Sequence, residues 1–86
     1  MALDASFIDS LVCPESMSRL RRAPEELVVR INTAIGDGLL RNRAGNLVTE
    51  SVGEALIRED SVLIYLVREE IPNLLIDESL EFDKLP

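Results

Sequence analysis

Six consecutive apolar residues, Val62 to Val67, form the longest apolar run in this chain of 86 residues. Because successive side chains of a strand point to opposite faces, the run predicts a strand that is apolar on both faces. One face would carry Val62, Ile64 and Leu66, and the other would carry Leu63, Tyr65 and Val67. A small antiparallel sheet usually leaves one face to water. We therefore expect this strand to need cover on both sides.

The residues around this run predict a hairpin. Glu54 to Arg58 form a second candidate strand, which Glu59-Asp60-Ser61 joins to the first. After the run, Ile71-Pro72 should interrupt any further ladder, because proline donates no N–H. Leu74-Leu75-Ile76 is either a last strand or a turn. The acidic end, residues 77–86, should be loosely held.

Two helices are predicted before the hairpin. The first would begin after Asp4, a candidate N-cap, and end before Pro14. The second would run from Pro24 to Asp37, where two glycines offer a left-handed stop. Apolar residues follow the helical spacing in both segments. The positions expected to be apolar contacts are Leu3, Phe7, Ile8 and Leu11 in the first helix, and Leu27, Val28, Ile31, Ala34 and Ile35 in the second.

These elements indicate a fold class. Leu39-Leu40 and Leu47-Val48 flank a glycine-containing loop, which predicts one more short hairpin. The expected fold is a single α+β domain over residues 1–86, with a small antiparallel sheet flanked by two or three helices. One face of the apolar strand can pack on the helix at 24–37. The other face, or the sheet edge, either meets another chain or is filled by the first helix and the tail.

The composition excludes several kinds of site. The chain has no histidine and one cysteine, Cys13. It therefore cannot form an internal disulfide, a Cys–His nucleophile or, within one chain, a tetrahedral zinc site. Gly36-Asp37-Gly38 follows a helix and lacks the third glycine of a dinucleotide-binding loop. We expect no catalytic residue, no metal and no cofactor, and we expect Cys13 to be a small buried side chain.

The charge pattern bears on possible partners. The net charge is −7, although residues 19–43 carry six arginines against three acidic side chains. This basic block has no aromatic residue on which bases could stack, so we expect no direct nucleic-acid binding. It is either a solvated basic surface or a docking region for an acidic partner. The apolar run is about a third of the roughly 20 residues that a membrane helix needs, and the N-terminus has no signal-peptide pattern. A cytoplasmic location without a membrane segment is expected.

Two segments resemble a known family. Leu11-Val12-Cys13-Pro14-Glu15-Ser16 resembles the opening zinc-knuckle half, Leu-x-Cys-Pro-x-Cys, of the Trm-one-twelve-like family. Residues 65–75 resemble its closing signature, Tyr-Pro-Ile-Arg-Asp-Gly-Ile-Pro-x-Leu-Leu, and the acidic Asp77-Glu78 is also similar. Residues 24–50 resemble the helix-plus-hairpin insert of some longer bacterial members. The family comprises small zinc-ribbon-like proteins, among them the activating subunit of several S-adenosylmethionine-dependent methyltransferases.

The resemblance implies four zinc-ligand positions, and only Cys13 keeps a thiol. Ser16 stands at the second position, and the other two fall near Arg58 and Ser61. Because a lone thiolate cannot hold structural zinc, we expect a zinc-ribbon-like fold without zinc, joined by apolar packing instead. Glu70 replaces a glycine of the closing signature, and a side chain there would be strained at a positive φ.

The resemblance implies a helper and not a catalyst. It suggests a partner-binding subunit that supports a methyltransferase, acting on RNA or a translation factor, through an apolar edge strand. The contact residues that follow are Val62, Leu63, Ile64, Tyr65, Leu66, Val67, Ile71, Pro72, Asn73 and Leu74. Three rival interpretations are a homodimer that pairs this edge with its own copy, a degenerate relic retained for stability or regulation, and a metal module that Cys13 assembles across chains.

Overall fold

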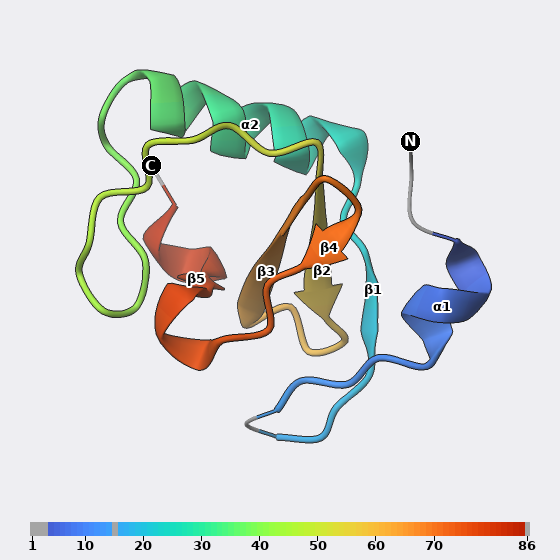
Figure 1. Cartoon of the computed structure of the whole chain (residues 1–86). Helices are drawn as coiled ribbons and strands as arrows, with labels where there is room; N and C mark the ends of the chain where they lie inside the picture. The colour runs from blue at the N-terminus through green and yellow to red at the C-terminus, as the bar shows by residue number, and fades with distance from the viewer. Residues whose placement is uncertain (1–3, 15, 86) are drawn as a thin grey trace.

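A curled antiparallel sheet lies at the centre of the computed structural model, which describes residues 4–14 and 16–85 (Figure 1). The strand order is β1-β2-β3-β4, and β5 also pairs with β3. The strands are β1 (Leu20–Arg22), β2 (Glu54–Arg58), β3 (Leu63–Arg68), β4 (Ile71–Pro72) and β5 (Leu80–Glu81). The predicted hairpin of β2 and β3 is confirmed, and its register places Leu56 opposite Tyr65.

Two α-helices accompany the sheet, α1 (Ala5–Asp9) and α2 (Glu25–Gly36). Both begin within one residue of the predicted start, but α1 ends at Asp9, earlier than the predicted end before Pro14. The Asp4 carboxylate accepts a hydrogen bond from the Ser6 N–H at 3.1 Å, and Pro24 is the N-cap of α2. Figure 1 shows α2 lying across one side of the sheet and α1 beside β1. No helix within the described ranges has the length and apolar content needed to cross a membrane.

Strand β3 separates two apolar clusters, and its alternate side chains enter each of them. Ile64 and Leu66 belong to the cluster on the α2 side, and Leu63, Tyr65 and Val67 belong to the other. The predicted division of the two faces is therefore confirmed for residues 63–67. Val62 is the exception, because it precedes β3 and is 48% exposed.

The second face of β3 is covered by the N-terminal part of the chain. Ile8 of α1, Cys13 and Leu20 join Tyr65 in that cluster, and Leu11 packs against it. The first helix therefore covers this face, which is one of the two possibilities that the sequence left open. The C-terminal segment packs instead on the α2 side. Of the other predicted helix contacts, Phe7 is exposed, and Leu3 lies outside the described residues.

Three expectations outside the central hairpin need correction. Ile71-Pro72 does not interrupt the ladder but forms β4, with Val67 opposite Pro72, because proline fits an edge strand where its missing N–H faces away. The acidic end is not loose, because β5 pairs with β3 and places the buried Leu80 opposite Ile64. The hairpin expected after α2 is reduced to a single bridge, Arg41 with Leu47. Between β4 and β5 the chain forms a 3-10 turn, η1 (Ile76–Glu78), and a second one, η2 (Phe82–Lys84), follows β5.

The pairing places β3 in the interior of the sheet. β2 occupies one side of β3, and β5 and β4 divide the other side between them. The outer strands of the main path are β1 and β4. The expectation that residues 62–67 form an edge strand for a partner is therefore wrong, because the backbone of β3 is paired within its own chain on both sides.

Candidate functional site

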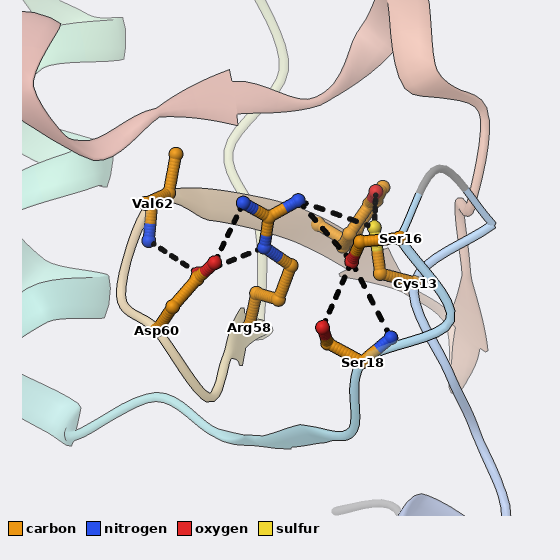
Figure 2. A network of polar contacts seen from close by, with 7 residues as sticks. Cys13, Ser16, Ser18, Arg58, Asp60 and Val62 are labelled. Atoms are coloured by element: carbon orange, nitrogen blue, oxygen red, sulfur yellow. Dashed lines mark hydrogen bonds and ion pairs between the residues drawn. The ribbon is translucent and has the colours of Figure 1, made fainter.

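A polar network joins the loop after α1 to the turn between β2 and β3 (Figure 2). Arg58, the last residue of β2, is buried at its centre. Its Nε and Nη2 atoms each lie 2.7 Å from a carboxylate oxygen of Asp60. Its Nη1 atom points the other way, 3.4 Å from Ser16 Oγ and 3.8 Å from Cys13 Sγ. We call these four residues, together with Tyr65, the Cys13–Arg58 network.

Backbone hydrogen bonds shape the loop that presents Cys13. The Met17 N–H donates to the Cys13 carbonyl at 2.7 Å, and the Cys13 N–H donates to the Ser18 carbonyl at 2.8 Å. Met17 closes the turn in the left-handed region, with a φ of 60°. One residue further from the tip of the loop on each side, Val12 forms an antiparallel β-bridge with Arg19. The loop is therefore the tip of a narrow hairpin that leads into β1.

The network changes the acidity of its members. The Tyr65 hydroxyl lies 2.8 Å from Cys13 Sγ. Burial raises the pKa of the Cys13 thiol, but hydrogen bonds from Tyr65, Ser16 and Arg58 lower it further than burial raises it, to about 7 from 9.0. Hydrogen bonds to Asp60 and then Cys13 raise the pKa of Arg58, and the bond from Arg58 lowers the pKa of the Asp60 carboxyl. A permanent cation thus faces a thiol that is partly ionised near neutral pH.

These residues do not fit a zinc ion. Cys13, Ser16 and Arg58 stand at three positions that the family resemblance assigns to zinc ligands, and the structure brings them together. Ser61, at the fourth, donates its N–H to the Arg58 carbonyl, but its hydroxyl accepts from Arg21. Zinc in proteins takes deprotonated sulfur, imidazole or carboxylate ligands, not a guanidinium. In the part of the chain that the structure describes, no three His, Cys, Asp or Glu side chains are grouped so as to hold a metal.

The network holds together two segments that are 45 residues apart in the sequence. Cys13 has 0% exposure, so a substrate cannot reach its sulfur in this conformation. The expectation that apolar packing joins the two halves is incomplete, because this ionic network acts beside the packing of Ile8 and Leu20 on Tyr65. The family resemblance placed a ligand position near Arg58 but gave no partner for this residue, and the sequence did not single out Asp60.

The predicted partner-contact residues divide into two groups. Leu63, Ile64, Tyr65, Leu66 and Val67 are buried in the two clusters and present no side-chain surface to a partner. The other five lie at the surface or close to it: Val62 and Ile71 are exposed, and Pro72, Asn73 and Leu74 are half-buried. The reason is that both faces of β3 are covered, one on the α2 side and the other by the N-terminal part of the chain.

The chain around β4 borders three hollows of the surface. We call residues 69–78, from Glu69 to Glu78, the β4 margin. The first hollow, of about 680 Å³, lies between the start of α2 and the Glu69-Glu70 turn. The second, of about 200 Å³, includes Asn73 in its wall, and the third, of about 590 Å³, is lined by Pro14 and residues 74–78. Ile71 and Leu75, both in the margin, are 68% and 60% exposed.

Comparisons with known proteins bear on the fold. No family model and no curated protein match the chain. Among solved structures, the chain is similar to the solution NMR structure of XF2673 from Xylella fastidiosa, with a TM-score of 0.76. The two sequences are 24% identical, and the match covers 96% of this chain and 86% of the other. This likeness shows a shared small α+β fold.

Proposed function

We propose that the protein is a non-catalytic partner-binding subunit that engages its partner through the β4 margin. One observation carries the proposal: the β4 margin exposes two large apolar side chains, Ile71 and Leu75, and residues of the same segment line three hollows of the surface. Scattered exposed apolar residues are normal, but apolar side chains grouped around grooves are typical of interaction surfaces. Of the residues that the sequence predicts as partner contacts, the margin contains Ile71, Pro72, Asn73 and Leu74, and these are the proposed contacts.

The contact is made by side chains and not by strand addition. The Asn73 N–H donates to the Leu66 carbonyl at 2.9 Å, so by ladder alternation the backbone of Pro72 faces away from β3. Proline offers no N–H there, and an added strand would find an acceptor without its matching donor. The partner therefore covers apolar side chains of the margin.

The partner that we propose is an S-adenosylmethionine-dependent methyltransferase that acts on RNA or a translation factor. The resemblance of residues 11–16 and 65–75 to the Trm-one-twelve-like family supports this choice. The proximity of Cys13, Ser16 and Arg58 also supports it, because the alignment requires these positions to meet. In this role the chain covers an apolar patch of the enzyme, and the enzyme keeps the cofactor and the chemistry. The fold would be a zinc ribbon in which an arginine replaces the metal.

The family resemblance has its own test. The triple variant Ser16→Cys, Arg58→Cys and Ser61→Cys supplies, with Cys13, the four thiols of a structural zinc site. We expect elemental analysis to find about one zinc per chain in this variant and none in Arg58→Cys alone. A triple variant that folds and excludes zinc would contradict the alignment of these positions with the family.

The function is tested by co-purification of the full chain from its source cell, with quantitative mass spectrometry. We expect a methyltransferase to be recovered with the wild type and to be lost with Ile71→Asp. The matched control is Leu39→Asp, because Leu39 is also exposed, at 62%, but lies outside the β4 margin. Equal recovery with wild type and Ile71→Asp would contradict the proposed surface, and recovery of no methyltransferase would contradict the proposed partner.

A further inference from the structure

We propose that the groove between Pro14 and residues 74–78 docks an apolar, positively charged segment of a partner protein. The inference rests on the proposed partner-binding function and specifies the chemistry of the segment that is bound. We call this hollow the Pro14 groove.

The walls of the Pro14 groove are apolar over most of its length. Pro14 comes from the loop after α1, and Leu74, Leu75 and Ile76 come from the β4 margin. The groove is an open hollow of about 590 Å³. Leu75 is 60% exposed, so part of the apolar wall faces water until something covers it. An extended or helical segment can insert apolar side chains here.

The negative charge at the groove favours an occupant with positive charge. Asp77 and Glu78 also line it among the described residues, and both are exposed. The β4 margin carries four carboxylates and no lysine or arginine. Within residues 4–14 and 16–85, the structure places no basic side chain in an ion pair with Asp77 or Glu78. A lysine or arginine beside the inserted apolar side chains would therefore meet unneutralised negative charge, which raises the association rate and favours basic partners.

Both walls are held in place before anything binds. Pro14 follows Cys13, which the guanidinium of Arg58 and the hydroxyl of Tyr65 fix from the other side. The opposite wall is tied down through its backbone, since the Ala44 N–H donates to the Asp77 carbonyl at 3.0 Å. The Ser79 hydroxyl also donates to the Ile76 carbonyl at 2.6 Å. A preorganised groove loses little conformational entropy on binding.

The larger hollow beside α2 fits this description less well. Its arginine, Arg22, lies 2.7 Å from Glu54, so part of the negative charge there is already neutralised. Its exposed side chains are mainly glutamates, and of its apolar residues Ala23 and Val67 are buried and Val28 is half-buried. Of these two hollows, the Pro14 groove combines an exposed apolar wall with carboxylates that form no ion pair with any described residue.

The test uses a synthetic amphipathic peptide of leucine and lysine as the probe, with the same peptide carrying glutamate for lysine as its matched control. Titration into the full-length, isotope-labelled protein is followed by NMR. We expect the amide shifts to concentrate at Cys13, Met17 and residues 74–78, and we expect the glutamate peptide to cause none. Affinity should fall at least tenfold in Leu75→Asp and in the double variant Asp77→Lys with Glu78→Lys. Leu39→Asp and Asp37→Lys, exposed changes elsewhere, should leave the affinity unchanged.

The outcomes separate the inference from the function on which it rests. Amide chemical-shift changes spread over the whole surface would contradict docking in the Pro14 groove. Equal affinity of Leu75→Asp and wild type for the lysine peptide would contradict it too. Concentration-dependent dimerisation that the lysine peptide cannot displace would assign the groove to a second copy and would also overturn the inference. If Leu75→Asp recovers as much methyltransferase as wild type, the groove fails while the proposed function stands. If wild type recovers no methyltransferase but the peptide maps to the groove, the function fails while the groove stands.

Discussion

At the scale of single residues, Arg58 carries the link between the N-terminal loop and the sheet. A guanidinium has donors on several sides of one plane, so it can bond Asp60 with one edge and reach Ser16 and Cys13 with another. An ammonium is a point charge and cannot span both sets of partners. One buried cationic side chain therefore bonds to groups from two loops that lie far apart in the sequence.

The first prediction concerns removal of this guanidinium. Arg58→Met keeps an apolar stem but removes the hydrogen bonds of the guanidinium to Asp60, Ser16 and Cys13, so we expect the free energy of unfolding to fall by about 2 kcal/mol. Arg58→Lys should recover less than half of that loss. Arg19→Met, at an exposed arginine, should change stability by less than about 0.5 kcal/mol. Urea denaturation followed by circular dichroism measures all three, and an Arg58→Met protein as stable as wild type would show that the network is not structural.

The second prediction follows from the pKa of Cys13, about 7 in the folded chain against 9.0 ordinarily. Because the folded pKa is the lower one, the thiolate stabilises the fold fully above pH 9, and this contribution is lost as the pH falls through 7. We expect the free energy of unfolding to rise on the order of 2 kcal/mol across this window. The chain has no histidine to titrate there.

Urea denaturation at a series of pH values measures this dependence, and the ultraviolet absorbance of the thiolate measures the pKa directly. Cys13→Ser, which keeps a small polar side chain, should remove the rise while leaving the rest of the profile in place. A wild-type profile as flat as that of Cys13→Ser would show that the thiol does not ionise in the fold.

The sequence determines side-chain neighbours only where local periodicity fixes them. The alternation of residues 63–67 places Ile64 and Tyr65 in opposite clusters, as predicted. The contact of Arg58 with Cys13 depends on how two distant loops meet, so no local pattern encodes it, and its only signal in the sequence is the family resemblance that assigns both residues to ligand positions. The buried position of Cys13 could be foreseen, but the effect of Tyr65 and Arg58 on its pKa could not.

At the scale of elements, the turn between β3 and β4 is held in an unfavourable conformation. Glu69 and Glu70 both lie in the left-handed region, with φ of 52° and 64°. Two residues with positive φ are the pattern of a type I′ hairpin turn, where Asn-Gly is preferred. The strain expected at Glu70 is therefore present, and the short ladder of β4 on β3 is sufficient to hold it.

The third prediction is that substitutions in the turn between β3 and β4 relieve its backbone strain. The double variant Glu69→Asn with Glu70→Gly should raise the free energy of unfolding by about 1–2 kcal/mol, because the left-handed region is unfavourable for residues with a Cβ. The control pair Glu69→Gln with Glu70→Gln removes the same charges and keeps the strain. If thermal unfolding shows equal gains for the two pairs, charge repulsion and not backbone strain destabilises this turn.

The elements that the sequence predicts are those with local signals. The N-cap residues, apolar stripe and terminal glycines of α2 act within a few residues of each other, as do the two runs of the β2–β3 hairpin. β4 and β5 are two residues long each and exist because β3 offers unpaired backbone on its second side. Such pairing is a property of the assembled sheet, and this is why the acidic end was expected to be loose.

At the scale of the whole molecule, one sheet separates two small cores. Its two outer strands avoid pairing with other chains in different ways. β1 presents the exposed Arg21 and Arg22, and β4 is short and contains Pro72. Charged side chains, short length and proline are the features by which edge strands avoid pairing with other chains. This arrangement agrees with contact through grooves better than with a homodimer built by strand pairing.

The last prediction is that the wild-type chain is a monomer at micromolar concentration and that Pro72 helps to keep it so. Pro72→Val supplies an outward N–H beside the outward carbonyl and completes an edge on which another strand can register. Light scattering after gel filtration should then detect dimers of Pro72→Val, while Pro24→Val, which removes a proline from the start of α2, should remain monomeric. A stable wild-type dimer that a charge at Ile71, such as Ile71→Asp, dissociates would favour the homodimer, because the same margin would then be occupied by a second copy.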